Sequence, residues 1–421
     1  MKRVVVTGLG IIAPNGQNKD TYWENTKNGV SFVGSDPEMK ALGFKSSVLC
    51  RIAHFDVSEH IEVSDYPELT ELDKFVQYGV AAGEQAIKDA NLEGLTEALS
   101  EEMGIIFSSA IGGTPTIVNI FDELTESGKT GLQYKPVGPR FYNSGMFNYP
   151  AMLLANKYKL SGPCTSITTG CTAGLDALGV CVDLIKSGEA NIMLAGASEA
   201  PLTPLTYATL DVINSLAVYD GDPTKSSRPF DLKRSGFVIS EGAVVFVLEE
   251  LEHALARQAP IYAEVKGFAS VSNAFHMTDL PANGLPMAEA VSRAISVSGL
   301  EPTDIGYINA HGSSTPQNDI FETSAYKAVF KEHAYNIPIS SVKSMIGHSL
   351  ASASLMGAMC VIGGIHNDVI PPTINYEYPD PACDLDYVPN VARSIKLNAG
   401  MVTASGFGGI HSAAIFTRYV S

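Results

Sequence analysis

Three residues with the chemistry for acyl transfer stand in three separate Gly-containing turns. Cys171 lies in TTGCTAG, His311 in NAHGSSTPQND and His348 in KSMIGHSLA. A thiol can take an acyl group from a thioester when nearby hydrogen-bond donors stabilise the oxyanion that forms. A condensation on that thioester also needs groups that stabilise the negative charge of a carbanion. One cysteine and two histidines can supply these functions together. The three turns therefore predict a site for thioester chemistry.

Cys171 stands where a helix is expected to begin, over Thr172–Lys186. The unpaired N–H groups and the positive dipole end of a helix start favour the thiolate form of a cysteine. The small neighbours Ala173 and Gly174 permit close packing around the thiol. A buried structural cysteine at a helix start would carry the same neighbours, so the nucleophile hypothesis depends on the two histidines.

Each histidine occupies a turn beside a buried element. His311 follows the strand-like GYINA, and turns at strand ends are where α/β folds keep functional groups. His348 begins a second apolar helix. A lone histidine is more often a core residue, but two in such turns favour a site. Lys343, in the apolar stretch before His348, needs a carboxylate partner unless it lies on the surface, and Glu322 and Asp319 are the candidates.

A glycine-rich loop near the C-terminus, SGFGGIHSA, is the fourth candidate segment. Gly406 and Gly408 flank Phe407 in it. Glycines let backbone N–H groups approach a substrate oxygen closely, and they leave room for Phe407 to swing. The alternative is an ordinary glycine turn before the last strand.

The composition narrows the classes of function. The chain has 421 residues, 45% of them apolar and 17% charged, which is typical of a compact α/β protein. The net charge of −17 argues against nucleic acid, because phosphate binding needs a basic surface. The six cysteines form no C-x-x-C pair, so no metal site is predicted. No uninterrupted apolar run of about 20 residues predicts a membrane span, and we expect a cytoplasmic protein.

Strands and helices alternate along the chain, which indicates sheets with helices packed on them. The first strand is expected at Val4–Thr7, ending at Gly8, and is not interpreted as a secretory signal. The other expected strands are Gly104–Ser108, Asn191–Ala195, Val244–Glu249, Tyr262–Phe268, Ile305–Asn309, Ile337–Ser340 and Met401–Ser405. The other expected helices are Phe75–Ala90, Pro286–Val297 and Glu322–Phe330.

The two halves of the chain resemble each other weakly. A turn with a Gly starts a helix of small residues at Cys171 and again at His348, and a strand-like segment follows each helix at a similar distance. A duplicated α/β unit explains both, and it would place these two residues at equivalent helix starts near a shared axis. Chance similarity between two Gly/Ala helices is the alternative. Separately, the aromatic, Gly/Pro-rich segment Ile117–Tyr149 is interpreted as a subunit interface or pocket wall.

Taken together, these segments resemble the β-ketoacyl-acyl carrier protein synthases of the thiolase superfamily. The resemblance extends along nearly the whole chain and rests on VVVTGLGIIAPNG, the Cys171 turn, SRPFDLKRSGFVISEGA, NAHGSSTPQND, KSMIGHS, VIPPTINYEYPDPACDLDYVP and GFGG. It implies an α/β, thiolase-like five-layer αβαβα fold from two duplicated halves, usually dimeric. Residues 1–255 would form the half with the nucleophilic cysteine, and residues 256–421 the half with both histidines.

The resemblance also implies roles. Cys171 would be the nucleophile, and His311 and His348 would bind the malonyl thioester oxygen and assist decarboxylation. Lys343 and Glu322 would support that site. The N–H groups of Cys171 and Phe407 would form the oxyanion hole, with Phe407 as a gate between Gly406 and Gly408. Ser313 and Thr315 would meet the phosphopantetheine arm of an acyl carrier protein, and the enzyme would have no cofactor of its own.

Within the family, GASEAPLTPLT, SNAFHMT, QNDIFETSAYK, GHSLA and GFGGIHSA look most like the ketosynthase (alpha) subunit of type II aromatic polyketide synthases. Fatty-acid elongation synthases tend to carry GFGGTN instead. The expected partners are an acyl carrier protein and a homologous chain-length factor in a heterodimer, or otherwise a second copy. The alternatives are a fatty-acid elongation synthase and a non-catalytic chain-length-setting subunit, with a degradative thiolase more distant because no Cys follows Cys383.

One stretch departs from the family pattern. Residues 59–74 read EHIEVSDYPELTELDK, where elongation enzymes tend to be basic and meet an acidic carrier protein. Such a stretch would repel an acidic carrier. Either it is a solvated acidic helix and the carrier docks elsewhere, or the carrier or partner has unusual charge. Basic residues that could receive the carrier are Lys225, Arg228, Lys233 and Arg234.

Overall fold

The computed structural model describes residues 2–94, 97–131, 138–281 and 283–420. Its centre is a ten-stranded sheet in the order β11-β10-β14-β15-β9-β1-β8-β6-β4-β5. These strands are β1 (Val4–Ile12), β4 (Met103–Ser108), β5 (Cys164–Ile167), β6 (Ile192–Glu199), β8 (Gly242–Glu250), β9 (Ala263–Ser272), β10 (Ile308–Asn309), β11 (Ile339–Ser340), β14 (Ala399–Gly406) and β15 (Ile410–Thr417). Short strands form two small sheets: β2 (Gly34–Ser35), β3 (Val48–Cys50) and β7 (Ile239–Ser240), and β12 (Val369–Ile370) and β13 (Arg393–Ser394).

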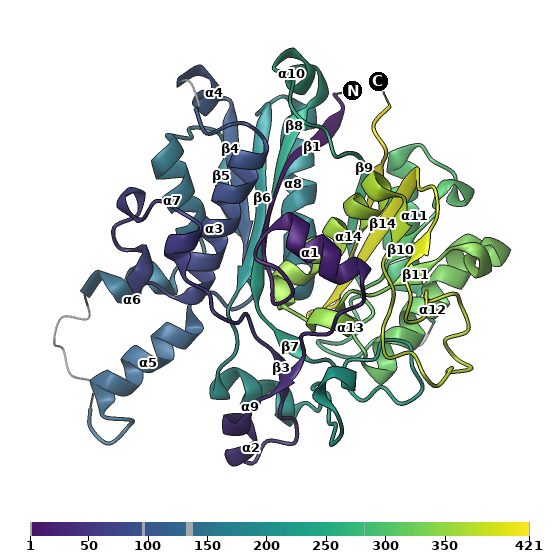
Figure 1. Cartoon of the computed structure of the whole chain (residues 1–421), viewed down its shortest axis with the longest axis horizontal. Helices are drawn as coiled ribbons and strands as arrows, with labels where there is room; N and C mark the ends of the chain where they lie inside the picture. The colour runs from purple at the N-terminus through teal and green to yellow at the C-terminus, as the bar shows by residue number, and fades with distance from the viewer. Residues whose placement is uncertain (1, 95–96, 132–137, 282, 421) are drawn as a thin grey trace.

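The helices fall between the strands, as expected (Figure 1). They are α1 (Lys19–Lys27), α2 (Pro37–Ala41), α3 (Lys74–Asp89), α4 (Glu97–Glu101), α5 (Thr114–Thr125), α6 (Gly138–Gly145), α7 (Tyr149–Tyr158), α8 (Ala173–Ser187), α9 (Pro204–Val212), α10 (Leu251–Ala256), α11 (Leu285–Ser298), α12 (Pro316–Phe330), α13 (Lys343–Ile346) and α14 (Ala353–Asn367). In the described part of the chain, one segment is long and apolar enough to span a membrane, Leu350–Asn367, and 83% of it is buried inside the protein, as a core helix would be.

The sheet repeats one pattern twice. In the first half β4 is parallel to β5 and β6, and β8 lies antiparallel between β6 and β1. In the second half β10 is parallel to β11 and β14, and β15 lies antiparallel between β14 and β9. The halves join where β1 pairs with β9, through Val5 with Glu264 and Val6 with Ala263. This symmetry agrees with the predicted duplication.

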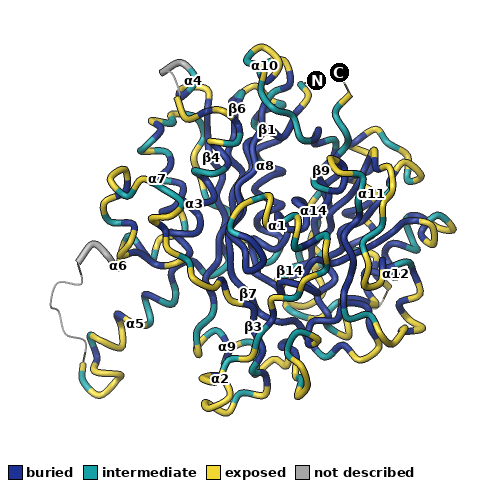
Figure 2. The backbone as a smooth tube through the Cα atoms, in the orientation of Figure 1, coloured by how far each residue is buried: buried dark blue, intermediate teal, exposed yellow. Residues whose placement is uncertain are grey.

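Helices cover both faces of each half-sheet, so that five layers alternate (Figure 1). Helices α3 and α7 pack on the outer face of the first half, and α11 and α12 on the outer face of the second. Helices α8 and α14 share the middle layer. Successive strand residues point to opposite faces, so Ile105 joins the outer core and Ile106 the middle one. The middle of the molecule is accordingly buried throughout (Figure 2).

The first strand runs further than predicted. It continues through Gly8 and Gly10 to Ile12, with a register shift between Val6 and Gly8. The two glycines do not end the strand, because they serve close packing. A Cβ on Gly8 would lie 2.3 Å from the carbonyl oxygen of Ala86 in α3, and one on Gly10 1.9 Å from that of Ala82.

We therefore expect Gly10→Ala to destabilise the protein by about 3 kcal/mol, because the added methyl overlaps helix backbone that cannot yield easily. The midpoint of urea unfolding measures the change. Gly34→Ala is the matched control, since a Cβ there has no atom within 4 Å, and it should move stability by less than about 0.5 kcal/mol. Equal effects of the two substitutions would contradict the packing explanation.

Two predicted helix starts also differ from the structure. Helix α12 begins at Pro316, six residues before the expected Glu322, because the Thr315 hydroxyl accepts a hydrogen bond from the N–H of Asn318 and caps the helix. Helix α8 begins at Ala173 after a 3-10 turn over Gly170–Thr172. Helix α12 therefore starts next to the His311 turn, and α8 starts next to Cys171.

The segment interpreted as an interface contains α5 and α6, which extend away from the body of the protein (Figure 1). Residues 132–137 of it lie outside the described residues. Among the described ones, Phe121 is 55% exposed and Tyr142 is 62% exposed. Exposed rings of this kind fit a surface that a partner covers, and the interface stays a prediction.

Candidate active site

Cys171 and both histidines meet in one cavity of about 480 Å³. Cys171 sits in the 3-10 turn that precedes α8, after Gly170, whose φ of +65° favours glycine. His348 lies just before the 3-10 turn Leu350–Ser352 that precedes α14, and His311 follows β10. The cavity is also lined by Ala110, Ser313, Thr315, Leu350, Ser405, Gly406 and Phe407. The structure thus brings together residues that are far apart in the chain.

The two histidine rings lie edge to face, with centroids 5.1 Å apart. The Ser405 N–H donates to Nδ1 of His311 at 3.2 Å, and the Leu350 N–H donates to Nδ1 of His348 at 3.1 Å. Burial, together with the nearby Lys343 ammonium, lowers the pKa of both imidazoles well below the usual value. Both rings are therefore neutral and carry their proton on Nε2. Two such N–H donors can hold a thioester oxygen.

Lys343 is buried, and its partner differs from the expected carboxylate. Its Nζ donates to the carbonyl oxygen of His311 at 2.6 Å. Burial lowers the pKa of Lys343 to about 8, and the Glu322 carboxylate opposes that shift. Asp319 is engaged elsewhere, because it accepts from the Phe230 N–H at 2.7 Å. Lys343 therefore fixes the backbone of the His311 turn directly.

Glu322 holds the same turn from the other side. Its carboxylate accepts from the N–H groups of His311 and Gly312, at 2.9 and 2.6 Å. The side chains of Asn318, Tyr326 and Thr403 also donate to it. The carboxylate is completely buried, so these donors replace its lost hydration. Its role is to order the His311 turn.

The electrostatics of Cys171 differ from the sequence-based expectation. The helix start was expected to favour the thiolate, yet burial raises the pKa of the Cys171 thiol to about 11. The Lys343 ammonium and the N–H groups of Phe407 and Cys171 itself act in the opposite direction and lower that pKa. Burial outweighs them, because a charged thiolate loses hydration when it is buried.

The alkylation rate of Cys171 should therefore keep rising with pH well above pH 9, since only the thiolate reacts and the raised pKa leaves little of it at neutrality. Iodoacetamide labelling followed by peptide mass spectrometry between pH 6.5 and 10.5 measures this profile. We expect roughly a tenfold gain per pH unit over most of that range. A plateau below pH 8 would show that the free protein stabilises the thiolate after all.

The glycine-rich loop forms the turn between β14 and β15. Its Phe407 N–H and the Cys171 N–H both approach the thiol closely enough to lower its pKa. An oxyanion formed at the Cys171 thioester would find the same two donors. Phe407 is 40% exposed and lines the cavity, as does Gly406. The Gly408 N–H is not available to an oxyanion, because it donates to the carbonyl of Met277 at 2.7 Å.

Ser313 and Thr315 both line the cavity and bond to each other through their hydroxyls at 2.9 Å. Sequence reasoning missed Asp176, which steadies the Cys171 turn. Its carboxylate accepts from the hydroxyl of Thr172 at 2.7 Å and from that of Ser412 at 2.6 Å. An aspartate in the first turn of an otherwise apolar helix was the available signal.

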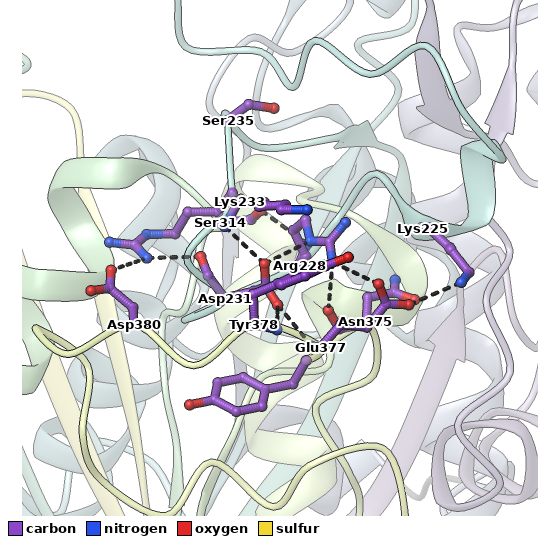
Figure 3. A network of polar contacts seen from close by, with 12 residues as sticks. Lys225, Arg228, Asp231, Lys233, Ser235, Ser314, Asn375, Glu377, Tyr378 and Asp380 are labelled. Atoms are coloured by element: carbon purple, nitrogen blue, oxygen red, sulfur yellow. Dashed lines mark hydrogen bonds and ion pairs between the residues drawn. The ribbon is translucent and has the colours of Figure 1, made fainter.

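The basic residues that are candidates to receive a carrier protein take part in a network of polar contacts (Figure 3). Arg228 and Arg234 are buried, and they bind Asp231 and Asp380 respectively. Further contacts of this network include Lys225 with Glu377, Arg228 with Glu377, and Lys233 over the ring of Tyr378. These charges fasten residues 375–380 to residues 225–234. The two buried arginines are therefore not free to receive a carrier protein, whereas Lys225 and Lys233 stay exposed.

The acidic stretch is likewise partly engaged. It forms three short 3-10 turns, Val57–Glu59, Val63–Asp65 and Leu69–Glu71, and not a helix. Glu68 accepts from Asn143 at 2.9 Å, and Asp73 caps α3 by accepting from the Phe75 N–H at 3.0 Å. The other acidic side chains stay exposed.

Comparison with known proteins places the chain in a family. Residues 1–254 match the family model described as the beta-ketoacyl synthase N-terminal domain, and residues 262–377 match that of the C-terminal domain. The chain is 40% identical over 423 residues to the tetracenomycin polyketide synthase ketoacyl synthase alpha subunit of Streptomyces glaucescens, covering 99% of this chain and 97% of that one. It is 38% identical over 422 residues to 3-oxoacyl-[acyl-carrier-protein] synthase 2 of Synechocystis, covering 99% and 98%.

Solved structures agree with this assignment and with the predicted thiolase-like fold. The chain superposes with a TM-score of 0.92 and 39% identity on a type II polyketide ketosynthase that was solved with its acyl carrier protein and bound to a hexaketide, over 100% of both chains. The ishigamide ketosynthase/chain length factor gives a TM-score of 0.87 and 30% identity, again over 100% of both. The chain therefore belongs to the beta-ketoacyl synthase family, as its motifs predicted.

Proposed function

We propose that the chain is the catalytic ketosynthase subunit of a type II polyketide synthase. It condenses a malonyl unit on an acyl carrier protein with an acyl chain held on Cys171, and repetition builds a poly-β-ketone. The observation that carries this proposal is the meeting of Cys171, His311 and His348 in one cavity. Full-length similarity to ketosynthases of this class supports it.

In the first stage the sulfur of Cys171 attacks the carbon of the incoming acyl thioester. The oxyanion that forms accepts hydrogen bonds from the N–H groups of Cys171 and Phe407. The carbonyl then re-forms, and the carrier thiol leaves with the proton that Cys171 has lost. The product of this stage is an acyl-enzyme with a thioester at Cys171.

In the second stage a malonyl thioester enters, and Nε2–H of His311 and His348 donate to its thioester oxygen. The bond to the carboxylate breaks, CO2 leaves, and the electron pair remains as an enolate on that oxygen. The enolate carbon attacks the Cys171 thioester, whose sulfur departs as thiolate. The chain is now two carbons longer and rests on the carrier protein.

The substrates would arrive on the phosphopantetheine arm of the carrier, with Ser313 and Thr315 as its contacts near the cavity. Residues 1–255 would supply the nucleophile and residues 256–421 both histidines. The partner would be a homologous chain-length factor, and the site of action the cytoplasm. Fatty-acid elongation is the second candidate, because the chain is also 38% identical to a 3-oxoacyl-[acyl-carrier-protein] synthase 2. An intact Cys171 speaks against a non-catalytic chain-length subunit.

Native mass spectrometry of the tagged protein from its own host, combined with product analysis, tests the proposal. We expect a one-to-one complex with a homologous chain of similar size that lacks the thiol, and unreduced poly-β-ketone products from malonyl-carrier protein. A homodimer that yields straight reduced chains in the presence of the reducing enzymes would support fatty-acid elongation instead.

A further inference from the structure

His411 is a buried histidine on β15 to which the proposed reaction gives no task. It is fully buried, it packs on the ring of Phe321 at a centroid distance of 5.1 Å, and burial lowers its pKa to about 4. It lies directly across the β14–β15 pair from Ser405. It is also one of the two residues, with Ile410, at which the loop SGFGGIHSA departs from the GFGGTN of fatty-acid elongation enzymes.

Ser405 connects His411 with His311 through hydrogen bonds. Its N–H donates to Nδ1 of His311 at 3.2 Å, and its Oγ lies 3.0 Å from Nδ1 of His411. The backbone N–H can only donate, so it keeps Nδ1 of His311 unprotonated and the proton on Nε2. The position of Ser405 therefore decides which form of His311 faces the substrate.

The proton of His411 can be placed from its other neighbour. The side-chain oxygen of Asn273 accepts from the Phe275 N–H at 2.9 Å, so the amide nitrogen of Asn273 must face His411, 3.4 Å from Nε2. That nitrogen donates, which leaves Nε2 of His411 unprotonated and the proton on Nδ1. His411 thus donates from Nδ1 to the hydroxyl of Ser405.

The same neighbours fasten the turn that carries Phe407. The Asn273 N–H donates to the carbonyl of Gly409, and the Gly408 N–H donates to that of Met277, both at 2.7 Å. Gly409 has a φ of +79°, and a Cβ there would lie 2.2 Å from the side-chain oxygen of Asn273. We call these two backbone bonds the Asn273 clamp. His411 contacts both the Asn273 side chain and Ser405 on β14.

We propose that His411 is a positioning residue of the condensation reaction. Through the bond between His411 and Ser405, it holds the N–H that keeps His311 in its Nε2–H form, and it anchors the Asn273 clamp on the Phe407 turn. The inference rests on the proposed role of His311 in decarboxylation. It adds a residue that never touches substrate and acts through Ser405.

The test measures decarboxylation apart from condensation. In a Cys171→Gln parent, CO2 release from malonyl-carrier protein gives kcat and KM for the step that needs His311. Two substitutions are introduced into this parent. His411→Leu fills a similar volume but has no hydrogen-bond donor. His411→Gln has an amide that can donate to Ser405 and accept from Asn273. His366→Leu, an exposed histidine on α14, is the matched control. Iodoacetamide labelling of Cys171 is measured in the same His411 variants with the cysteine intact.

We expect His411→Leu to lower kcat for decarboxylation at least tenfold with little change in KM, His411→Gln to recover it to within about threefold, and Cys171 labelling to change less than twofold. A kcat for decarboxylation in His411→Leu equal to that of the Cys171→Gln parent would overturn the inference. So would equal losses of decarboxylation and labelling in His411→Leu, or no recovery with Gln, because these indicate general disruption. If the Cys171→Gln parent itself releases no CO2, the proposed function fails first and the inference falls with it.

Discussion

Replacing Cys171 with alanine should abolish condensation, with a loss of at least about a thousandfold in product formation. The methyl group cannot form a thioester, so no acyl-enzyme is available for the malonyl unit to react with. The cavity offers no second thiol, because Cys171 is the one cysteine among its lining residues. Transfer of a radiolabelled acyl group to the protein, and formation of ketide products, measure the two stages separately.

Two companion variants sharpen this prediction. Cys164→Ala removes an exposed thiol on β5 and should leave both stages unchanged, which controls for labelling of any accessible cysteine. Cys171→Gln should lose acyl transfer but keep CO2 release from malonyl-carrier protein, because His311 and His348 are untouched. Elongated chains from the Cys171→Ala protein would show that the nucleophile has been assigned wrongly.

Replacing Glu322 with leucine should have the largest effect on stability, a loss of about 3–5 kcal/mol. The carboxylate is completely buried and accepts from two backbone N–H groups, those of His311 and Gly312. It also accepts from the side chains of Asn318, Tyr326 and Thr403. Leucine can accept no hydrogen bond, so the Gly312 N–H loses the acceptor that it has in the structure. The His311 N–H and the Asn318 amide keep only their longer bonds, to Thr403 at 3.3 Å and to Asp319 at 3.2 Å.

Thermal and urea unfolding measure this loss, and CO2 release measures the consequence for the site. Glu332→Leu is the matched control, because Glu332 is exposed on the 3-10 segment that follows α12, and it should change stability by less than about 0.5 kcal/mol. The loss of stability for Glu322→Gln should lie between those of Glu322→Leu and Glu332→Leu, because glutamine keeps one acceptor oxygen. A Glu322→Leu protein as stable as the control would mean that the network contributes little.

The repeated α/β pattern and the convergence of the three turns could be predicted from sequence, because each rests on a local signal. Helix starts and strand ends have characteristic residues, and a duplicated topology brings equivalent positions together. The length of β1 could not be predicted in this way. Gly8 and Gly10 read locally as breakers, and only their contact with α3 shows that they permit packing.

The partner of Lys343 and the pKa of Cys171 were beyond sequence reasoning for a related reason. Both depend on what surrounds a group in three dimensions. For Lys343 this is a carbonyl of the His311 turn, and for Cys171 it is the burial of the thiol. The two arginines among the basic residues at 225–234 are a further instance. Charge along the chain does not reveal that Arg228 and Arg234 are buried against carboxylates. The assigned catalytic roles stay predictions until the variants are measured.

The matching topology of the two half-sheets has a consequence for how such an enzyme can evolve. Cys171 and His348 both lie in the segment that leads into the middle-layer helix of their half, Cys171 before α8 and His348 before α14. An ancestor that paired with itself would have had one residue at both places, bound to change in both together. Two copies within one chain can change independently, so that one segment can supply the nucleophile and the other the hydrogen-bond donor. Pairing with a homologous subunit would repeat that division of labour one level higher.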